Sequence, residues 1–273
     1  MKSIDLKDLN NFELQTLLQT AIAPRPIALA STIDRNGNIN LSPFSFFNIF
    51  SSNPPIVIFS PARRVRDNTT KHTLENILEV PEVVIGNVSF NMVQQVSLSS
   101  TEYEDGINEF VKAGLTMKNA DLVKPPLIVE SPVNMECKVL EIKPLGKEGG
   151  AGNLIICEVL KVHVREEFLD KDEKLDQTKL NLVSRLGGNW YGKTSADTLF
   201  EVPKPLATKG IGYDQLPEEI KNSTVFTGND LGMLANIEEL PKGQFSAKLE
   251  LHRKAQNLLL ESKISEAWGL LNQ

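Results

Sequence analysis

The sequence is poor in the residue types that build metal centres and covalent cross-links. Its 273 residues include two cysteines, Cys137 and Cys157, and three histidines. The cysteines lie in two separate predicted strands, with neither a CxxC pair nor a neighbouring histidine, so neither a metal site nor a disulfide framework is predicted. Free cysteines are typical of a reducing compartment, and a cytoplasmic location is expected.

Long apolar runs and an excess of positive charge are also missing. No stretch approaches the roughly 18 apolar residues that a membrane-spanning helix needs, so no membrane partner is predicted. Asp and Glu outnumber Lys and Arg by 35 to 29, which gives a net charge of −6. A nucleic-acid groove would require a basic face, so no nucleic-acid partner is predicted either. Small ligands are expected instead, and an anionic ligand would need a local cluster of basic residues.

The common catalytic signatures are absent, and one binding motif stands in the wrong context. Neither GxGxxG, HExxH nor a Ser-His-Asp arrangement is found. Residues 187–194 read GGNWYGKT and satisfy the P-loop expression. A polar segment, residues 176–185, precedes them where a buried strand should lie, and Trp190 and Tyr191 are bulky for a loop that wraps phosphate. We therefore reject a nucleotide-binding P-loop. The three histidines, His72, His163 and His252, have no partner visible in the sequence.

The chain up to about residue 206 has the pattern of a mainly β domain with inserted helices. Alternating or apolar segments bounded by turn residues predict six strands, and Asn36-Gly37 predicts a hairpin after the first. Successive antiparallel strands interrupted by helices predict a six-stranded Greek-key barrel. The strands are expected at residues 27–33, 39–48, 56–60, 83–88, 133–142 and 154–164, and the helices at residues 13–22, 69–78, 91–100 and 107–113.

The composition changes to helix-forming residues after Pro203 and Pro205. Helices are predicted near residues 214–221, 230–237 and 247–272. We therefore predict two domains, a β domain over residues 1–206 and a helical C-terminal extension over residues 207–273.

Residues 40–47 depart from the pattern of a simple amphipathic strand. Ser42 and Ser45 alternate poorly with the neighbouring phenylalanines, and Pro43 removes a ladder donor. Such a strand suits an aromatic ligand seated on its backbone. It equally suits an edge strand whose serines face water, and the pattern does not decide between these interpretations.

A second candidate site lies at the predicted start of the helix near residue 69. Arg63, Arg64 and Arg66 precede Thr69-Thr70-Lys71. Free N–H groups and hydroxyls at a helix N-terminus, with cations beside them, form an anion-binding site. The alternative is an ordinary helix start beside a solvated basic loop.

Several runs of residues, spread in order along the chain, resemble one known family. They are similar to the flavin reductase-like, FMN-binding split β-barrel family, and the resemblance covers residues 22–203. It implies a split barrel that binds FMN at the interface of a homodimer. The runs are RPIALAST at 25–32, NLSPFSFFN at 40–48, NPPIVIFS at 53–60, KHTLENI at 71–77, PVNMEC at 132–137 and LGGNWY at 186–191.

The resemblance also implies where each part of FMN would lie. The isoalloxazine ring would rest on the second strand, and the phosphate would lie near the following loop and helix. The residues implied at the ring are Leu41, Ser42, Pro43, Phe44 and Ser45. Those implied at the phosphate are Ser60, Arg63, Arg64, Thr69, Thr70 and Lys71. Those implied on the substrate side are Asn153, Arg185, Gly188 and Tyr191, with Arg185 a candidate to hold a phosphate of the nicotinamide.

The implied activity is two-electron transfer from a reduced nicotinamide, NADH or NADPH, through FMN to free flavin or another acceptor. The cofactor would carry the chemistry, so no catalytic side chain is expected. Two positions depart from the family pattern: His72 replaces a common Asp, and Asn153 replaces a His that many reductases carry. The second departure leaves open a non-catalytic flavin carrier or sensor. A flavin-free structural relative is a third alternative.

Overall fold

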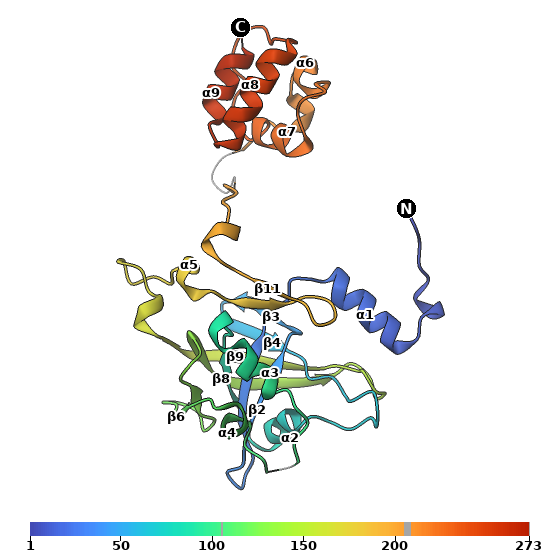
Figure 1. The fold of residues 1–273 in the computed structure, drawn as a ribbon, viewed down its shortest axis with the longest axis vertical. Coiled ribbons are helices and arrows are strands. Elements are labelled where there is room, and N and C mark those ends of the chain that lie inside the picture. The colour runs from blue at the N-terminus through green and yellow to red at the C-terminus, as the bar shows by residue number, and fades with distance from the viewer. Residues whose placement is uncertain (105, 205–208, 273) are drawn as a thin grey trace. The chain divides into compact units, whose positions relative to one another are not determined.

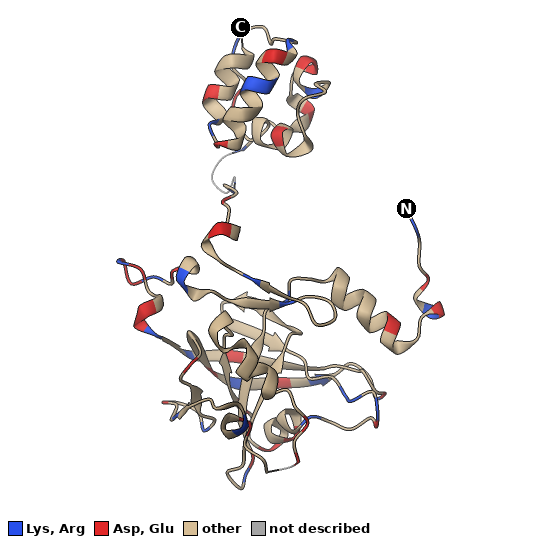
Figure 2. Ribbon diagram, in the orientation of Figure 1, with Lys and Arg blue, Asp and Glu red and all other residues tan. Residues whose placement is uncertain are grey.

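The structure is a computed structural model that describes residues 1–104, 106–204 and 209–272 (Figure 1). The chain divides into two units, Met1–Leu199 and Phe200–Gln273. The predicted domain boundary after residue 206 lies outside the described residues. Acidic and basic residues are interspersed along both units (Figure 2). Among the described residues, no helix has the length and apolar character that crossing a membrane requires.

A seven-stranded antiparallel sheet forms the framework of the first unit. The prediction of a mainly β fold with inserted helices is confirmed. The prediction of a six-stranded Greek-key split barrel is wrong in strand number and closure, because the sheet has seven strands and two open ends, β2 and β3. In sheet order the strands are β2 (Ile39–Phe44), β1 (Ala28–Ile33), β5 (Glu82–Gly86), β8 (Val133–Pro144), β9 (Asn153–Val164), β4 (Pro55–Phe59) and β3 (Phe47–Ser52).

The additional strand comes from residues 39–48, which were predicted as one strand. β2 pairs with β1, whereas β3 pairs with β4, so the chain passes from one end of the sheet to the other at Ser45 and Phe46. Pro43 is tolerated in β2 because an edge strand leaves some N–H positions without a ladder partner. The irregular polar positions of this segment therefore mark a break between two strands.

Both faces of β1 are buried, and its residues are apolar or small, with Ser31 and Thr32 the buried polar ones. Ala28 and Ala30 pack into a cluster that includes Phe59 of β4 and residues of α2 (His72–Glu79). Leu29 packs into a second cluster. That cluster also contains residues of α3 (Val93–Leu98) and α4 (Glu109–Ala113). Helices therefore pack against two apolar surfaces of the sheet.

Smaller elements complete the first unit. The N-terminal helix α1 (Asn11–Ala21) begins with a capping box between Asn10 and Glu13, and none of its residues is buried. The segment that satisfies the P-loop expression forms part of the β10–β11 hairpin. The bounds of the other elements are β6 (Met117–Lys118), β7 (Leu127–Ile128), α5 (Gln177–Leu180), β10 (Val183–Arg185) and β11 (Tyr191–Lys193), with 3-10 helices η1 (Leu6–Asp8), η2 (Phe90–Met92), η3 (Glu166–Phe168) and η4 (Ala196–Thr198).

The second unit is helical, and Leu234, Ala255 and Trp268 lie in its core. The long helix predicted over residues 247–272 is two helices, because Ser262 adopts a left-handed backbone (φ +58°) that ends the first of them. The elements are η5 (Tyr213–Gln215), α6 (Glu218–Lys221), α7 (Gly228–Leu234), α8 (Leu249–Leu260) and α9 (Ile264–Leu271).

Candidate functional site

A small polar cavity lies where α2 begins. Its volume is about 20 Å³, which is room for little more than one water molecule. Arg64 and Lys71 line it from the loop before the helix, and His72 and Thr73 line it from the first helical turn. The remaining lining residues are Asn40, Ser42, Ser99, Ser100, Thr101, Glu102, Tyr103 and Glu109. Because the first N–H groups of a helix have no partner within it, this end of α2 favours an anion.

One carboxylate already occupies the basic end of this cavity. Glu102 lies 3.0 Å from Nε of Arg64, 3.3 Å from Nη2 of Arg66 and 3.6 Å from Nζ of Lys71. Partial desolvation alone would raise the pKa of Glu102. The hydrogen bond from Arg64 and the charges of Lys71, Arg64 and Arg66 outweigh it and hold that pKa below its ordinary value. The three cations therefore form a site that binds an oxyanion of the chain itself.

The structure separates the other residues expected around the phosphate. α2 starts at His72, three residues later than predicted, so Thr69 and Thr70 belong to the preceding loop. The hydroxyl of Thr69 accepts a 3.0 Å hydrogen bond from Arg64, while that of Thr70 donates to Glu75. The other two residues, Arg63 and Ser60, lie away from the cavity. Arg63 Nε donates to Oδ1 of Asn68 at 2.6 Å, and Ser60 is buried beside Gly152. Neither Arg63, Ser60, Thr69 nor Thr70 lines the cavity.

A larger cavity of about 500 Å³ brings together residues predicted for the ring and for the substrate side. Pro43, Phe44 and Ser45 line it from the end of β2, and Arg185 and Tyr191 line it from the β10–β11 hairpin. Ser100 lines this cavity and the small one, so the two adjoin. The remaining lining residues are Ile27, Gln94, Val96, Ser97 and Asn189. Together the cavities form an elongated site with a basic end and a roomier end.

Three further predicted residues, besides Ser60, Arg63, Thr69 and Thr70, line neither cavity. The side chain of Leu41 is buried in the core, and its N–H donates to Glu109 at 2.9 Å. Asn153 is buried at the start of β9, where both its backbone N–H and its Nδ2 donate to the carbonyl of Pro61 at 3.1 Å. The carbonyl of Gly188 accepts a 2.8 Å hydrogen bond from Arg185. Gly188 therefore acts on the site through Arg185, and Asn153 holds a turn.

Comparison with known proteins identifies the family. The model of the flavin reductase like domain matches residues 20–179. The chain belongs to the flavin reductase-like family. An uncharacterised protein of Aquifex aeolicus is 34% identical over 197 residues, which are 72% of this chain and 98% of that protein.

Two solved structures support the assignment of this chain to the flavin reductase-like family. Nitrilotriacetate monooxygenase component B from Bacillus cereus is 28% identical with a TM-score of 0.69, over 74% of this chain and 98% of its own. The 2-nitrobenzoate 2-nitroreductase NbaA of Pseudomonas fluorescens is 25% identical with a TM-score of 0.66, over 77% of this chain and all of its own. The family match ends at residue 179, before the β10–β11 hairpin and the second unit.

Arg25 is a buried residue that the sequence reasoning did not single out. Its side chain donates to the carbonyls of Gln19 and Ile22 at the end of α1 and to the carbonyl of Leu186, the last at 3.0 Å. Its Nε lies 3.4 Å from Oγ of Ser45. Burial and the charge of Arg185 lower the pKa of Arg25. In the flavin reductase-like protein Arg25 thus joins the end of α1 to Leu186 and reaches Ser45 after β2. Its place in the RPIALAST run was the only sequence signal of it.

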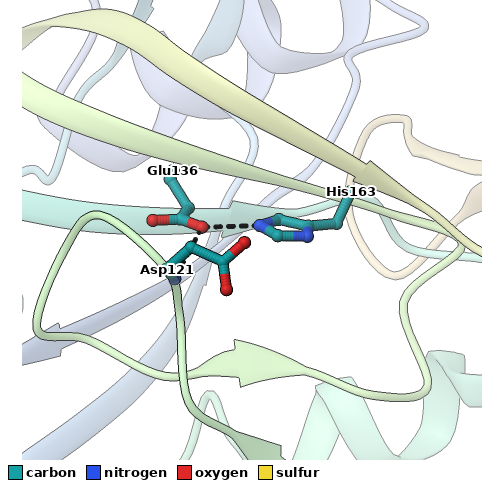
Figure 3. A group of neighbouring side chains, drawn as sticks. All are labelled: Asp121, Glu136 and His163. Carbon is teal, nitrogen blue, oxygen red and sulfur yellow. Dashed lines mark hydrogen bonds and ion pairs between the residues drawn. The ribbon is translucent and has the colours of Figure 1, made fainter.

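A separate group of Asp121, Glu136 and His163 resembles a metal-ligand set, since their ligand atoms lie within 4.8 Å of one another (Figure 3). Glu136 is fully buried and accepts hydrogen bonds from the backbone N–H groups of Asp121 and Leu122 at 2.9 and 2.6 Å and from Val123 at 3.1 Å. Nε2 of His163 lies 2.5 Å from Glu136. The oxygens of Glu136 therefore have hydrogen-bond partners within the protein, and the group fastens residues 121–123 to the sheet.

The other two histidines also have defined surroundings. His252, which showed no partner in the sequence, is buried in the second unit, 2.8 Å from Oγ of Ser223 and 2.6 Å from the carbonyl of Ser246. Its ring stacks on Phe226 at 5.0 Å. His72 lines the small cavity. His252 therefore has a structural environment, and His72 is the histidine placed at the candidate site.

Proposed function

We propose that this flavin reductase-like protein is an FMN-dependent oxidoreductase that takes electrons from NADH or NADPH and passes them to free flavin or another acceptor. The observation that carries the proposal is the elongated site, in which a basic cavity adjoins a cavity of about 500 Å³ through Ser100. Ligand pockets for molecules of cofactor size have about 300–1,000 Å³.

The residues present fit FMN. Pro43, Phe44 and Ser45 would hold the isoalloxazine ring, and Arg64 and Lys71 would hold the phosphate at the start of α2. Glu102 supports this placement because its carboxylate is an oxyanion bound by the same cations. Bound FMN would supply the hydride chemistry, and the protein would orient the cofactor and its partner.

A cytoplasmic location fits the state of the two cysteines. Cys137 and Cys157 are buried free thiols in the sheet. Burial raises the pKa of the Cys137 thiol to about 12, and burial with the neighbouring Cys137 raises the pKa of Cys157 as well. Such thiols are unreactive, and they support a proposal in which neither cysteine takes part in electron transfer.

An anaerobic titration tests the activity. The purified protein is loaded with FMN and mixed with NADH or NADPH while the visible spectrum is recorded. If the proposal is correct, the bound flavin should bleach within seconds of mixing. The rival proposal, a flavin carrier or sensor, expects the yellow colour to persist for hours with either nicotinamide and to disappear at once with dithionite.

A pair of arginine variants tests the phosphate placement. Arg64→Ala removes a cation that lines the cavity, and Arg66→Ala removes an equal charge from a side chain that is 76% exposed. Charge-assisted hydrogen bonds contribute about 1.5–3 kcal/mol, so Arg64→Ala should weaken FMN about 10- to 100-fold and leave riboflavin unchanged. Arg66→Ala should change neither by more than about threefold. Equal losses for FMN and riboflavin in Arg64→Ala would place the phosphate elsewhere.

A further inference from the structure

The β10–β11 hairpin presents two cations and an aromatic ring on one face. Arg185 pairs with Tyr191 and Val183 pairs with Lys193 across the hairpin. Because side chains alternate along a strand, these four residues project from the same side. The guanidinium of Arg185 lies 4.5 Å from the ring centroid of Tyr191.

This face forms one wall of a continuous groove, and α3 forms the other. A cavity of about 190 Å³ shares Gln94, Ser97 and Tyr191 with the cavity of about 500 Å³. Arg185 lines the larger cavity together with Pro43, Phe44 and Ser45, and Lys193 lines the smaller one beyond Tyr191. The groove therefore runs from the proposed flavin ring past Arg185 to Lys193.

The groove is suited to anions. Among the described residues that line the two cavities there is no Asp or Glu, although the whole chain carries a net charge of −6. Asp197 interacts electrostatically with Lys193 but does not line the groove, and its carboxylate accepts a hydrogen bond from Ser195. An anionic ligand would meet two cations here and no opposing carboxylate on the walls.

Both cations have unused donors and a fixed position. Within the described part of the chain, the Arg185 side chain makes one hydrogen bond, to the carbonyl of Gly188 at 2.8 Å. Nζ of Lys193 lies 4.5 Å from the ring centroid of Phe90, and no ion pair of Lys193 occurs among the described residues. Three backbone hydrogen bonds of 2.9–3.0 Å hold the hairpin and its flanks in place. The N–H of Val183 donates to Val88, that of Phe90 at the start of η2 donates to Asn181, and that of Thr194 donates to Leu182.

We propose that this groove binds the phosphorylated adenosine half of NADPH, with Arg185 on the diphosphate and Lys193 on the 2′-phosphate. The inference rests on the proposed use of a reduced nicotinamide. Arg185 and Lys193 are diagonal neighbours across the hairpin, a relation that spans about 7–8 Å. The adenosine half of NADPH matches this order, because its diphosphate and its 2′-phosphate are separated by one ribose ring. The diphosphate would lie nearer the flavin and the 2′-phosphate further along the groove. NADH lacks the second group and would leave Lys193 unpaired, so NADPH is the preferred reductant.

A binding experiment tests the groove without relying on turnover. The full-length native protein is titrated by calorimetry with adenosine 2′,5′-bisphosphate and with adenosine 5′-monophosphate. The bisphosphate should bind at least about tenfold more tightly, and Lys193→Gln should abolish that difference while Lys193→Arg keeps it. Lys174→Gln, at an exposed position outside the groove, is the matched control and should behave as native.

Kinetics then separate this inference from the proposed function. Lys193→Gln should lower kcat/KM for NADPH about tenfold and change that for NADH less than twofold. A native preference for NADH, or an equal effect of Lys193→Gln on both nicotinamides, would overturn the groove assignment and leave the reductase standing. Lys193-dependent bisphosphate binding with no flavin reduction by either nicotinamide would support the groove and contradict the reductase.

Discussion

We expect Glu102 to compete with an anionic ligand for the cations at the start of α2. Its carboxylate contacts Arg64, Arg66 and Lys71, and the cavity beside it is too small for a phosphate group unless Glu102 moves. Glu102→Gln keeps the shape and removes the charge. We expect FMN to bind roughly fivefold more tightly to this variant, a gain of about 1 kcal/mol, because the phosphate no longer displaces an ion-pair network.

Fluorescence titration with FMN and with riboflavin measures this effect. Riboflavin has no phosphate and should bind Glu102→Gln and the native protein alike. Glu104→Gln serves as the control, since Glu104 is exposed and does not line the cavity. Weaker FMN binding by Glu102→Gln would mean that Glu102 organises the cations and does not compete with the ligand.

Glu136 links the pH to the stability of the first unit. Burial alone would raise the pKa of Glu136, but hydrogen bonds from the N–H of Asp121, from His163 and from the N–H of Leu122 outweigh it and hold the pKa below the ordinary 4.5. A folded-state pKa below the unfolded one means that ionised Glu136 stabilises the fold above about pH 4.5, and that this stability is lost as the pH falls through the lowered value.

Glu136→Gln tests this linkage because it replaces one carboxylate oxygen with an NH2 group. That oxygen accepts hydrogen bonds, whereas the NH2 group would face N–H donors. Urea denaturation at pH 7 should show a loss of about 2–4 kcal/mol in the free energy of unfolding. The difference from the native protein should shrink as the pH is lowered toward 3. Glu141→Gln, at an exposed position on the same strand, should stay within about 0.5 kcal/mol. A pH-independent difference would show that packing, and not charge, is lost.

At the scale of whole elements, α1 docks through a close approach to Gly187. A Cβ at Gly187 would lie 2.2 Å from Oγ1 and 3.2 Å from Cα of Thr20 on α1. Since α1 buries none of its residues fully, this approach and the Arg25 hydrogen bonds are two close attachments that hold it. Gly187→Ala should displace α1 and cost about 1–3 kcal/mol, as overpacking does.

Limited chymotrypsin digestion reports the displacement, because cleavage after Phe12 requires the helix to open. We expect cleavage at least about tenfold faster in Gly187→Ala than in the native protein. Gly232→Ala in α7 is the control, since a Cβ there meets no atom within 4 Å. Unchanged cleavage would show that Arg25 alone holds the helix.

At the scale of the whole molecule, the open end of the sheet predicts a homodimer. β3 is an edge strand on which Ile49 and Phe50 are 66% and 63% exposed. Exposed apolar edge strands pair with another chain unless they are covered. We expect a dimer in sedimentation velocity, and Phe50→Lys should shift it toward monomer by at least about tenfold in Kd. Val111→Lys, also at an exposed apolar position, should not. A native monomer that holds stoichiometric FMN would contradict the prediction.

The second unit should be separable from the first. Its core residues form a cluster of their own, and the family match ends at residue 179. A chain ending at residue 204 should therefore fold, bind FMN as the full-length protein does, and keep the midpoint of thermal unfolding of the first unit. Loss of soluble expression in this shortened chain would show instead that the helical extension belongs to the core.

The sequence by itself determined the class of the fold and most of its strands. The alternating segments at residues 133–142 and 154–164 became β8 and β9, and Asn36-Gly37 lies at the turn between β1 and β2. These features follow from neighbours in the chain, because side-chain periodicity and turn geometry are local properties. The basic run before α2 is likewise a local feature, and the anion site for a ligand that it indicates stays a prediction.

The tertiary structure decided which of the candidate residues meet. It divided residues 39–48 between the two ends of the sheet, brought Arg185 to Pro43, and left Ser60 and Asn153 away from both cavities. It also brought together residues that are distant in the sequence: Glu102 contacts Arg64, 38 residues away, and Arg25 contacts Leu186, 161 residues away. No local pattern encodes such pairs, because they depend on how the packed sheet and helices bring distant segments together.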